Sequence, residues 1–125
     1  MAGTPRVETP TTLTPGSSGA ADLAREMGDL MWSRVGIRRD REGLMAAAAE
    51  LKKLEAALGR HPVERGAIEA RNLLVLGGLV ARAALDREES RGAHYRRDFP
   101  ARRDEWARHL EYRAPGPAPD LPRRD

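Results

Sequence analysis

Apolar residues recur at helical spacing in three consecutive segments of this chain. In the first, from about Ala20 to Gly36, they fall on one face of a helix: Leu23, Met27, Leu30, Met31 and Val35. The second segment follows Asp40, a residue type favoured at a helix N-cap, and stops at Gly59. Its apolar stripe comprises Leu44, Ala47, Ala48, Leu51, Leu54 and Leu58. The pattern therefore predicts two amphipathic helices.

The third segment predicts a longer helix, from Pro62 to about Ser90. Proline is favoured in the first turn of a helix because its missing N–H would be unpaired there in any case. Arg87 and Arg91 are placed to interact with the negative end of the helix dipole. Gly92 fits the position just beyond a helix end.

The middle of this third helix is unusual because it is apolar on nearly every side from Leu73 to Leu85. A helix of that kind is buried on most sides. Gly77 and Gly78 lie at its centre, and each costs about 1 kcal/mol relative to alanine. They therefore indicate a neighbouring backbone that packs too close for a side chain. The first two helices can cover two sides, and either the tail after Gly92 or a partner surface must cover the third.

The predicted fold is all-α: a three-helix bundle with an irregular C-terminal tail and disordered ends. Residues 1–19 and 113–125 are rich in proline and polar residues, so we expect a disordered linker and a disordered tail there. Residues 20–112 form the predicted helical domain. The N-terminal stretch has no apolar core typical of a secretory signal, and no apolar run reaches the 20 or so residues of a membrane span.

Composition removes several classes of chemistry. The chain has no cysteine, which excludes disulfides, thiolate nucleophiles and the common structural zinc and iron–sulfur sites. No dinucleotide fingerprint, P-loop or HExxH motif occurs in the sequence. The absence of cysteine is compatible with a reducing compartment, and we expect a cytoplasmic protein.

The segment REESRGAHYRRDFPARRDEW contains the best candidates for catalysis. Ser90 and His94 could form a nucleophile–base pair, but a third group would have to orient the base. We instead expect these two residues to cap and orient the chain. Glu88 and Glu89 are adjacent on a helix and point about 100° apart, which argues against a shared acid–base function.

Arginines and aromatic residues alternate in residues 91–113, which hold seven arginines against four acids. The same stretch contains four of the five aromatic residues: Tyr95, Phe99, Trp106 and Tyr112. Single-stranded nucleic acids are bound by such combinations through phosphate contacts and base stacking. Because acids are interspersed, we favour the alternative, in which the aromatic residues anchor the tail on the bundle while the arginines form ion pairs.

Two stretches resemble a known family. The run EARNLLVLGGLVARAALDREESRGAHYRRDFPARRD closely resembles the C-terminal helical domain of L-aspartate oxidase and of succinate dehydrogenase and fumarate reductase flavoprotein subunits. Its most specific element is ESRGAHYRRDFP, Glu89 to Pro100. The upstream run MGDLMWSRVGIRRDREGLMAAAAELKKLE resembles the start of that domain. Met31-Trp32 and the ARNLL sequence at residues 70–74 look more like the oxidase than the dehydrogenase.

The resemblance implies a three-helix bundle packed against a flavin-binding domain or subunit. L-aspartate oxidase oxidises L-aspartate to iminoaspartate with FAD and supplies quinolinate synthase in NAD biosynthesis, whereas its relatives interconvert succinate and fumarate. The family's dinucleotide fingerprint and main substrate-binding residues lie upstream of this domain and are absent from this chain. We therefore expect a separately encoded or truncated domain that holds no FAD alone, with no catalytic, cofactor-binding or metal-binding residue assigned.

The family motif carries over to seven positions, which we expect to shape the helix end and the interface with the flavin-bearing domain: Glu89, Ser90, Arg91, Gly92, His94, Asp98 and Pro100. Two other hypotheses stay open. One is a free-standing adaptor that uses the Arg/aromatic tail on nucleic acid or an acidic protein, although we expect no nucleic-acid partner. The other is a non-functional remnant of a split gene.

Overall fold

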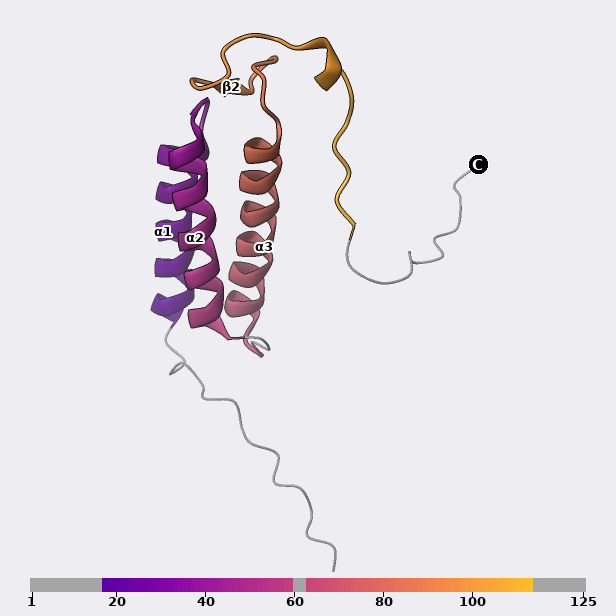
Figure 1. The fold of residues 1–125 in the computed structure, drawn as a ribbon. Coiled ribbons are helices and arrows are strands. Elements are labelled where there is room, and N and C mark those ends of the chain that lie inside the picture. The colour runs from indigo at the N-terminus through magenta and orange to yellow at the C-terminus, as the bar shows by residue number, and fades with distance from the viewer. Residues whose placement is uncertain (1–16, 60–62, 114–125) are drawn as a thin grey trace, which may run out of the picture.

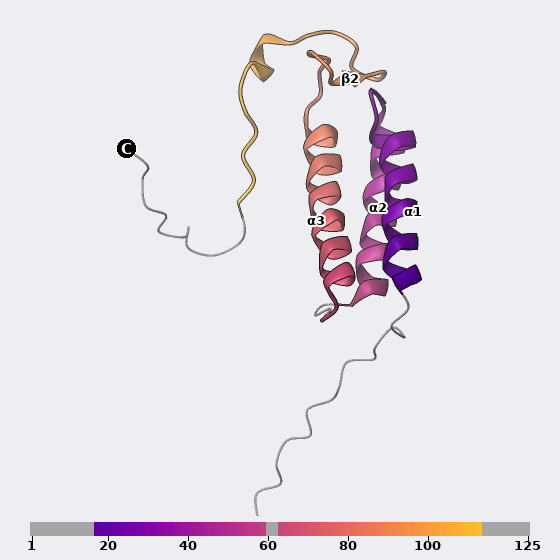
Figure 2. The same ribbon diagram turned by 180° about the vertical axis from the view of Figure 1, so that it is seen from behind.

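Three helices packed side by side form the body of the molecule, as Figure 1 and the reverse view in Figure 2 show. The computed structural model describes residues 17–59 and 63–113, so the expectations for residues 1–16, for Pro62 and for residues 114–125 lie outside it. The helices are α1 (Ser17–Val35), α2 (Arg41–Leu58) and α3 (Arg65–Asp86). They run alternately up, down and up (Figure 1). The predicted all-α bundle is confirmed.

The ends of α2 follow the predicted capping residues. The Asp40 carboxylate accepts a hydrogen bond from the Gly43 amide at 2.8 Å, which satisfies a backbone donor that the first turn leaves open. Gly59 ends the helix with a φ of 79°, a conformation that favours glycine. The start of α1 differs slightly from the prediction, because the helix begins at Ser17 and not at Ala20.

Both predicted ends of α3 are wrong. The helix begins at Arg65 and not at Pro62, because Glu64 has an extended backbone and is its N-cap. The helix stops at Asp86, short of Ser90, and Arg87 already has an extended backbone. Arg87 and Arg91 do not bind the last helical carbonyls: both donate to the carboxylate of Glu89.

Gly92 does adopt the left-handed conformation expected of it, with a φ of 57°. However, it lies inside a tight turn closed by paired backbone hydrogen bonds between Arg91 and His94, and not at the helix end. The sequence pattern identified a turn glycine correctly but assigned it to the wrong structure.

The core lies between the three helices and is built mainly from leucine and alanine. Its buried apolar members are Val35, Leu44, Ala47, Leu51, Leu54, Leu58, Ala70, Leu74, Ala81 and Ala84. Small residues on the inner face of α3 let α1 and α2 approach closely. A Cβ added to Gly77 would lie 2.9 Å from Met27 Cε and 3.4 Å from Met31 Sδ. Gly77 therefore meets side chains of α1 and not a backbone, and Gly78 has nothing within 4 Å.

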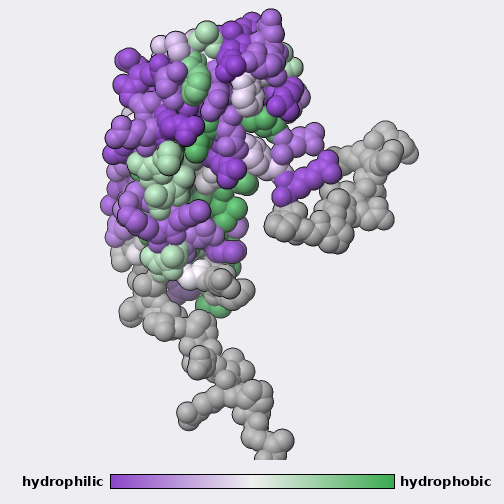
Figure 3. Space-filling view, in the orientation of Figure 1, coloured by the Kyte–Doolittle hydropathy of each residue, from purple (hydrophilic) through white to green (hydrophobic). Residues whose placement is uncertain are grey.

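The opposite face of α3 is apolar and exposed, so of the two covers considered for it, the described part of the tail after Gly92 is not the one. Leu76 is 58% exposed, and the described tail leaves five further large apolar residues of this face open: Ile68, Leu73, Val75, Leu79 and Val80. Figure 3 shows hydrophobic surface along the helices, below a strongly hydrophilic end of the bundle. Hence α1 and α2 cover only part of α3.

After α3 the chain crosses the end of the bundle where α1 ends and α2 begins (Figure 1). The short strand β2 (Tyr95–Arg96) pairs in parallel with β1 (Arg38–Arg39), which lies in the α1–α2 connection. The Arg97 amide extends this pairing by donating to the Arg39 carbonyl at 2.7 Å. One turn of 3-10 helix, η1 (Asp104–Trp106), follows. The predicted irregular tail thus packs on the bundle through its first part.

Candidate functional site

The candidate site is a cluster of charged side chains at the C-terminal end of α3, and Arg96 is its most buried cation. Its Nη1 donates to the carbonyls of Ala84 and Leu85, both at 2.9 Å. Its Nε and Nη2 donate to the two carboxylate oxygens of Asp98 at 2.8 and 2.6 Å. The last carbonyls of a helix have no partner within the helix. Arg96 therefore caps α3 in the role that the sequence analysis gave to Arg87 and Arg91.

Glu89 is the buried anion of the cluster, with a side chain that is completely inaccessible to solvent. Its Oε1 accepts from Arg91 Nε at 2.9 Å and from Arg87 Nη1 at 2.6 Å, while Oε2 accepts from the Arg103 amide at 3.0 Å. The hydrogen bond from Arg91, with the other two donors, outweighs the effect of burial and lowers the pKa of Glu89 to about 2. The carboxylate therefore stays ionised at neutral pH and holds the tail together.

Ser90 and His94 bind different partners. The Ser90 hydroxyl accepts from the Arg96 amide at 2.9 Å and donates to the Phe99 carbonyl at 2.8 Å. The His94 ring contacts Arg39 Nη1 through Nδ1 and the Arg87 carbonyl through Nε2. With both residues engaged in this way, their hydrogen bonds favour the expected orienting function over a nucleophile–base pair.

The seven motif residues lie in one segment, but only some of them enter the buried cluster. Glu89, Ser90, Arg91 and His94 do so, and Asp98 joins it to α2 by accepting from the Arg41 amide at 3.2 Å. Gly92 and Pro100 are exposed. Their function at an interface stays a prediction.

Arg96 and Arg39 were not among the site residues predicted from the sequence. No local signal singled out Arg96, because Arg97 is even closer to Asp98 and the carbonyls that Arg96 binds are eleven and twelve residues away in the sequence. Arg39 gave no signal either, since it contacts His94 from 55 residues away in the sequence.

Aromatic residues of the tail contact arginines and the bundle. The Trp106 ring lies 5.9 Å from Arg87 Cζ and 5.6 Å from Arg108 Cζ, and the Phe99 ring lies 5.0 Å from Arg96 Cζ. The Tyr112 hydroxyl donates to Asp86 at the end of α3 at 2.9 Å. These contacts agree with the anchoring function that we favoured over nucleic-acid binding.

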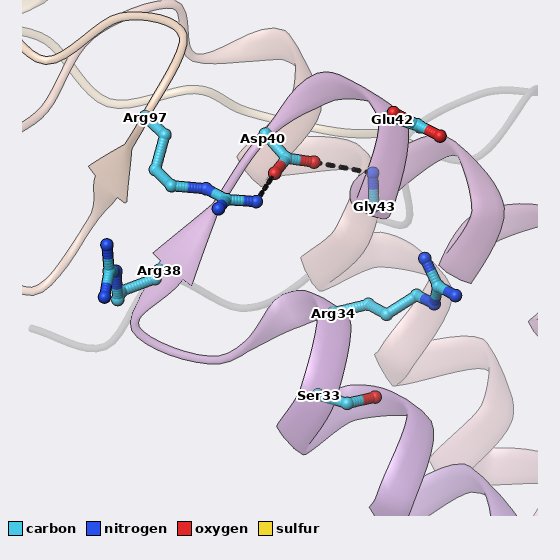
Figure 4. A pocket seen from close by; sticks show the side chains of 7 residues that line it. All are labelled: Ser33, Arg34, Arg38, Asp40, Glu42, Gly43 and Arg97. Atoms are coloured by element: carbon cyan, nitrogen blue, oxygen red, sulfur yellow. Dashed lines mark hydrogen bonds and ion pairs between the residues drawn. The ribbon is translucent and has the colours of Figure 1, made fainter.

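A polar hollow of about 260 Å³ lies beside the cluster, where α1 meets the start of α2. Figure 4 shows Asp40 between Arg97 and the Gly43 amide. The remaining lining residues are Ser33, Arg34, Arg38 and Glu42. The lining of this hollow is charged, whereas ligand pockets are usually lined mainly by apolar residues. Among the described residues, no group of acidic and histidine side chains could hold a metal ion.

The comparisons with known proteins agree with this architecture. The model of the family described as fumarate reductase flavoprotein C-term matches residues 24–120. The match takes in most of α1, all of α2 and α3, and the charged cluster. The chain therefore belongs to this family and is a C-terminal domain of the fumarate reductase and L-aspartate oxidase-like flavoproteins.

Two relatives illustrate the range of the family. One is a component of the CoM/CoB fumarate reductase of Methanothermobacter marburgensis, which is 42% identical over 104 residues that cover 76% of this chain and 19% of the relative. The L-aspartate oxidase of Pyrococcus abyssi is 43% identical over 91 residues, covering 72% of this chain and 16% of the relative. The chain thus spans less than a fifth of either protein. No solved structure matches it significantly. In the part of the chain that the structure describes, no helix is long and apolar enough to cross a membrane.

Proposed function

We propose that this chain is the helical domain of an L-aspartate oxidase-like oxidoreductase that uses FAD. In this proposal it supports a flavin-binding domain, which oxidises L-aspartate to iminoaspartate and so serves NAD biosynthesis through quinolinate synthase. The resemblance of Met31-Trp32 and of residues 70–74 to the oxidase favours this substrate. The alternative is a partner that interconverts succinate and fumarate.

The exposed apolar face of α3 carries the proposal. Six large apolar side chains lie on one helix, and each is between 38% and 58% exposed. Burying such surface contributes about 25 cal/mol per Å², and exposed patches of this kind mark sites of interaction. The relatives carry the matching segment within a chain about five times as long, since it makes up 19% of one of them. A flavin-binding domain is therefore the partner that best accounts for the open face.

Co-expression with the flavin-binding domain of an L-aspartate oxidase, shortened by its own helical segment, tests the proposal. We expect a complex on size-exclusion chromatography and a rise in aspartate-dependent hydrogen peroxide production. Leu76→Glu places a charge at the most exposed position of the face and should abolish both. Met45→Glu is the matched control, because Met45 is 53% exposed on α2, outside the face.

The two substrates separate the proposal from its alternative. A complex that reduces fumarate or oxidises succinate, and leaves aspartate unchanged, would assign the chain to the other branch of the family. Docking through α3 would be contradicted if no complex formed. It would also be contradicted if Leu76→Glu and Met45→Glu weakened the complex and the peroxide production equally.

A further inference from the structure

His94 is held between two elements by hydrogen bonds that require its neutral form. Its Nδ1 lies 2.7 Å from Arg39 Nη1 on β1, and its Nε2 lies 3.1 Å from the carbonyl of Arg87, the residue after α3. A guanidinium can only donate hydrogen bonds. Nδ1 must therefore accept from Arg39, and Nε2 must carry the hydrogen that is donated to Arg87. A proton on Nδ1 would break the first bond and place two cations against each other.

The charged groups that face His94 are cations from three elements: Arg39 of β1, Arg87 after α3 and Arg96 of β2. The carboxylates at this end of the bundle are already paired with arginines: Glu89 with Arg87 and Arg91, Asp98 with Arg96, and Asp40 with Arg97. Burial, followed by the three cations, lowers the pKa of His94, although its hydrogen bond to Arg87 acts in the opposite direction.

We propose that His94 is an acid-sensitive latch that fastens the tail to the α1–α2 connection. In its neutral form it joins the tail to β1, next to the parallel pairing of Arg38 with Tyr95 and of Arg39 with Arg96. Protonation pushes the ring away from Arg39 and releases this pairing, while the apolar core between the helices stays intact. This latch does not depend on the identity of the partner or substrate proposed above.

The pH range follows from linkage. An unlatched histidine takes up a proton near its ordinary pKa of about 6.5, whereas the latched one resists protonation. The unlatched state therefore binds more protons below this pH, and acid shifts the equilibrium towards it. Latching is fully favourable above about pH 6.5 and weakens as the pH falls.

Hydrogen exchange on the full chain tests the latch. The Arg97 amide donates to the Arg39 carbonyl across the pairing, so its protection factor reports latching. We expect this factor, corrected for intrinsic exchange, to fall by up to about tenfold per pH unit below about 6.5, while amides in the middle of α2 keep theirs. His94→Gln should remove the pH dependence, because an amide can both accept and donate without titrating. His109→Gln, at an exposed histidine of the same tail, should behave as wild type.

A protection factor that does not change with pH in the wild type, or one that still changes in His94→Gln, would overturn the proposal. If His94→Gln lost its helical circular dichroism, NMR titration of the His94 ring in the wild type would decide. A midpoint below the ordinary value for histidine, with matching changes at the Arg97 amide, supports the latch. A midpoint at or above that value refutes it.

Discussion

At the scale of single residues, the most informative feature is that two fully buried charged side chains stabilise the tail. Glu89 accepts three hydrogen bonds and Arg96 donates to carbonyls and to a carboxylate, so neither charge is left without partners. Buried charges are tolerated only when they are paired and hydrogen-bonded. The tail thus obtains its order from a few specific contacts and not from an apolar core of its own.

Acid should weaken the folded state through Glu89. Its pKa is about 2 in the folded chain and 4.5 ordinarily, so the folded carboxylate contributes its full stabilisation above pH 4.5 and loses it as the pH falls towards 2. Glu89→Gln should lower the urea midpoint at neutral pH, and the difference in midpoint between this variant and the wild type should become smaller in acid. Urea unfolding at about pH 7, 4 and 2.5 measures this.

Glu88→Gln is the matched control, because Glu88 is adjacent, partly exposed and paired with Arg41 at 3.6 Å. Exposed ion pairs contribute little, so this variant should follow the wild type at every pH. A constant gap between Glu89→Gln and wild type from neutral pH to pH 2.5 would show that the carboxylate does not act through its charge.

At the scale of secondary-structure elements, α3 has two unlike faces. The inner face is built from small residues that bring α1 close, and the outer face is built from large apolar residues that nothing described covers. The adjacent glycines at its centre mark the boundary. Gly77 belongs to the packed face, whereas the half-buried Gly78 has free space where a side chain would begin.

Alanine substitutions should distinguish these glycines. Gly78→Ala is expected to raise the unfolding free energy by about 1 kcal/mol, because alanine is the better helix former and its methyl group meets nothing. Gly77→Ala should change the unfolding free energy little or not at all. Met27 must move away from the new methyl group, and this disturbed packing offsets the gain in helix propensity. Chemical denaturation measures both variants. Equal gains would show that α1 is not tightly packed against Gly77.

At the scale of the whole molecule, Arg96 joins the tail to the bundle because it binds the end of α3 and the tail residue Asp98 together. Arg96→Leu should lower the unfolding free energy by about 3 kcal/mol, the lower end of the range for breaking a buried ion pair. Arg97→Leu removes a more exposed partner of Asp40 and should cost less than about 1 kcal/mol. Urea titrations measure the unfolding free energies of both variants. Similar losses of stability in the two would argue against Arg96 as the link between tail and bundle.

Much of this architecture could be predicted from local patterns. The apolar stripe of α2 and its caps at Asp40 and Gly59 depend on residues only a few positions apart, so the sequence pattern alone predicts them. The end of α3 could not be predicted in this way. The helix stops where an arginine from later in the chain binds its carbonyls, so the deciding contact is between residues that are not neighbours in sequence. The sequence also indicated that α1 and α2 leave one side of α3 uncovered, but apolar periodicity shows which residues favour burial and not which chain buries them, so it could not choose between the tail and a partner.

The capping of α3 by Arg96 has a consequence for synthesis on the ribosome. Arg96 follows Ala84 by twelve residues, so all of α3 is translated before the side chain that closes its last turn exists. Chains fold from the N-terminus as they emerge. The last carbonyls of α3 therefore stay without their Arg96 cap until the motif has also been made.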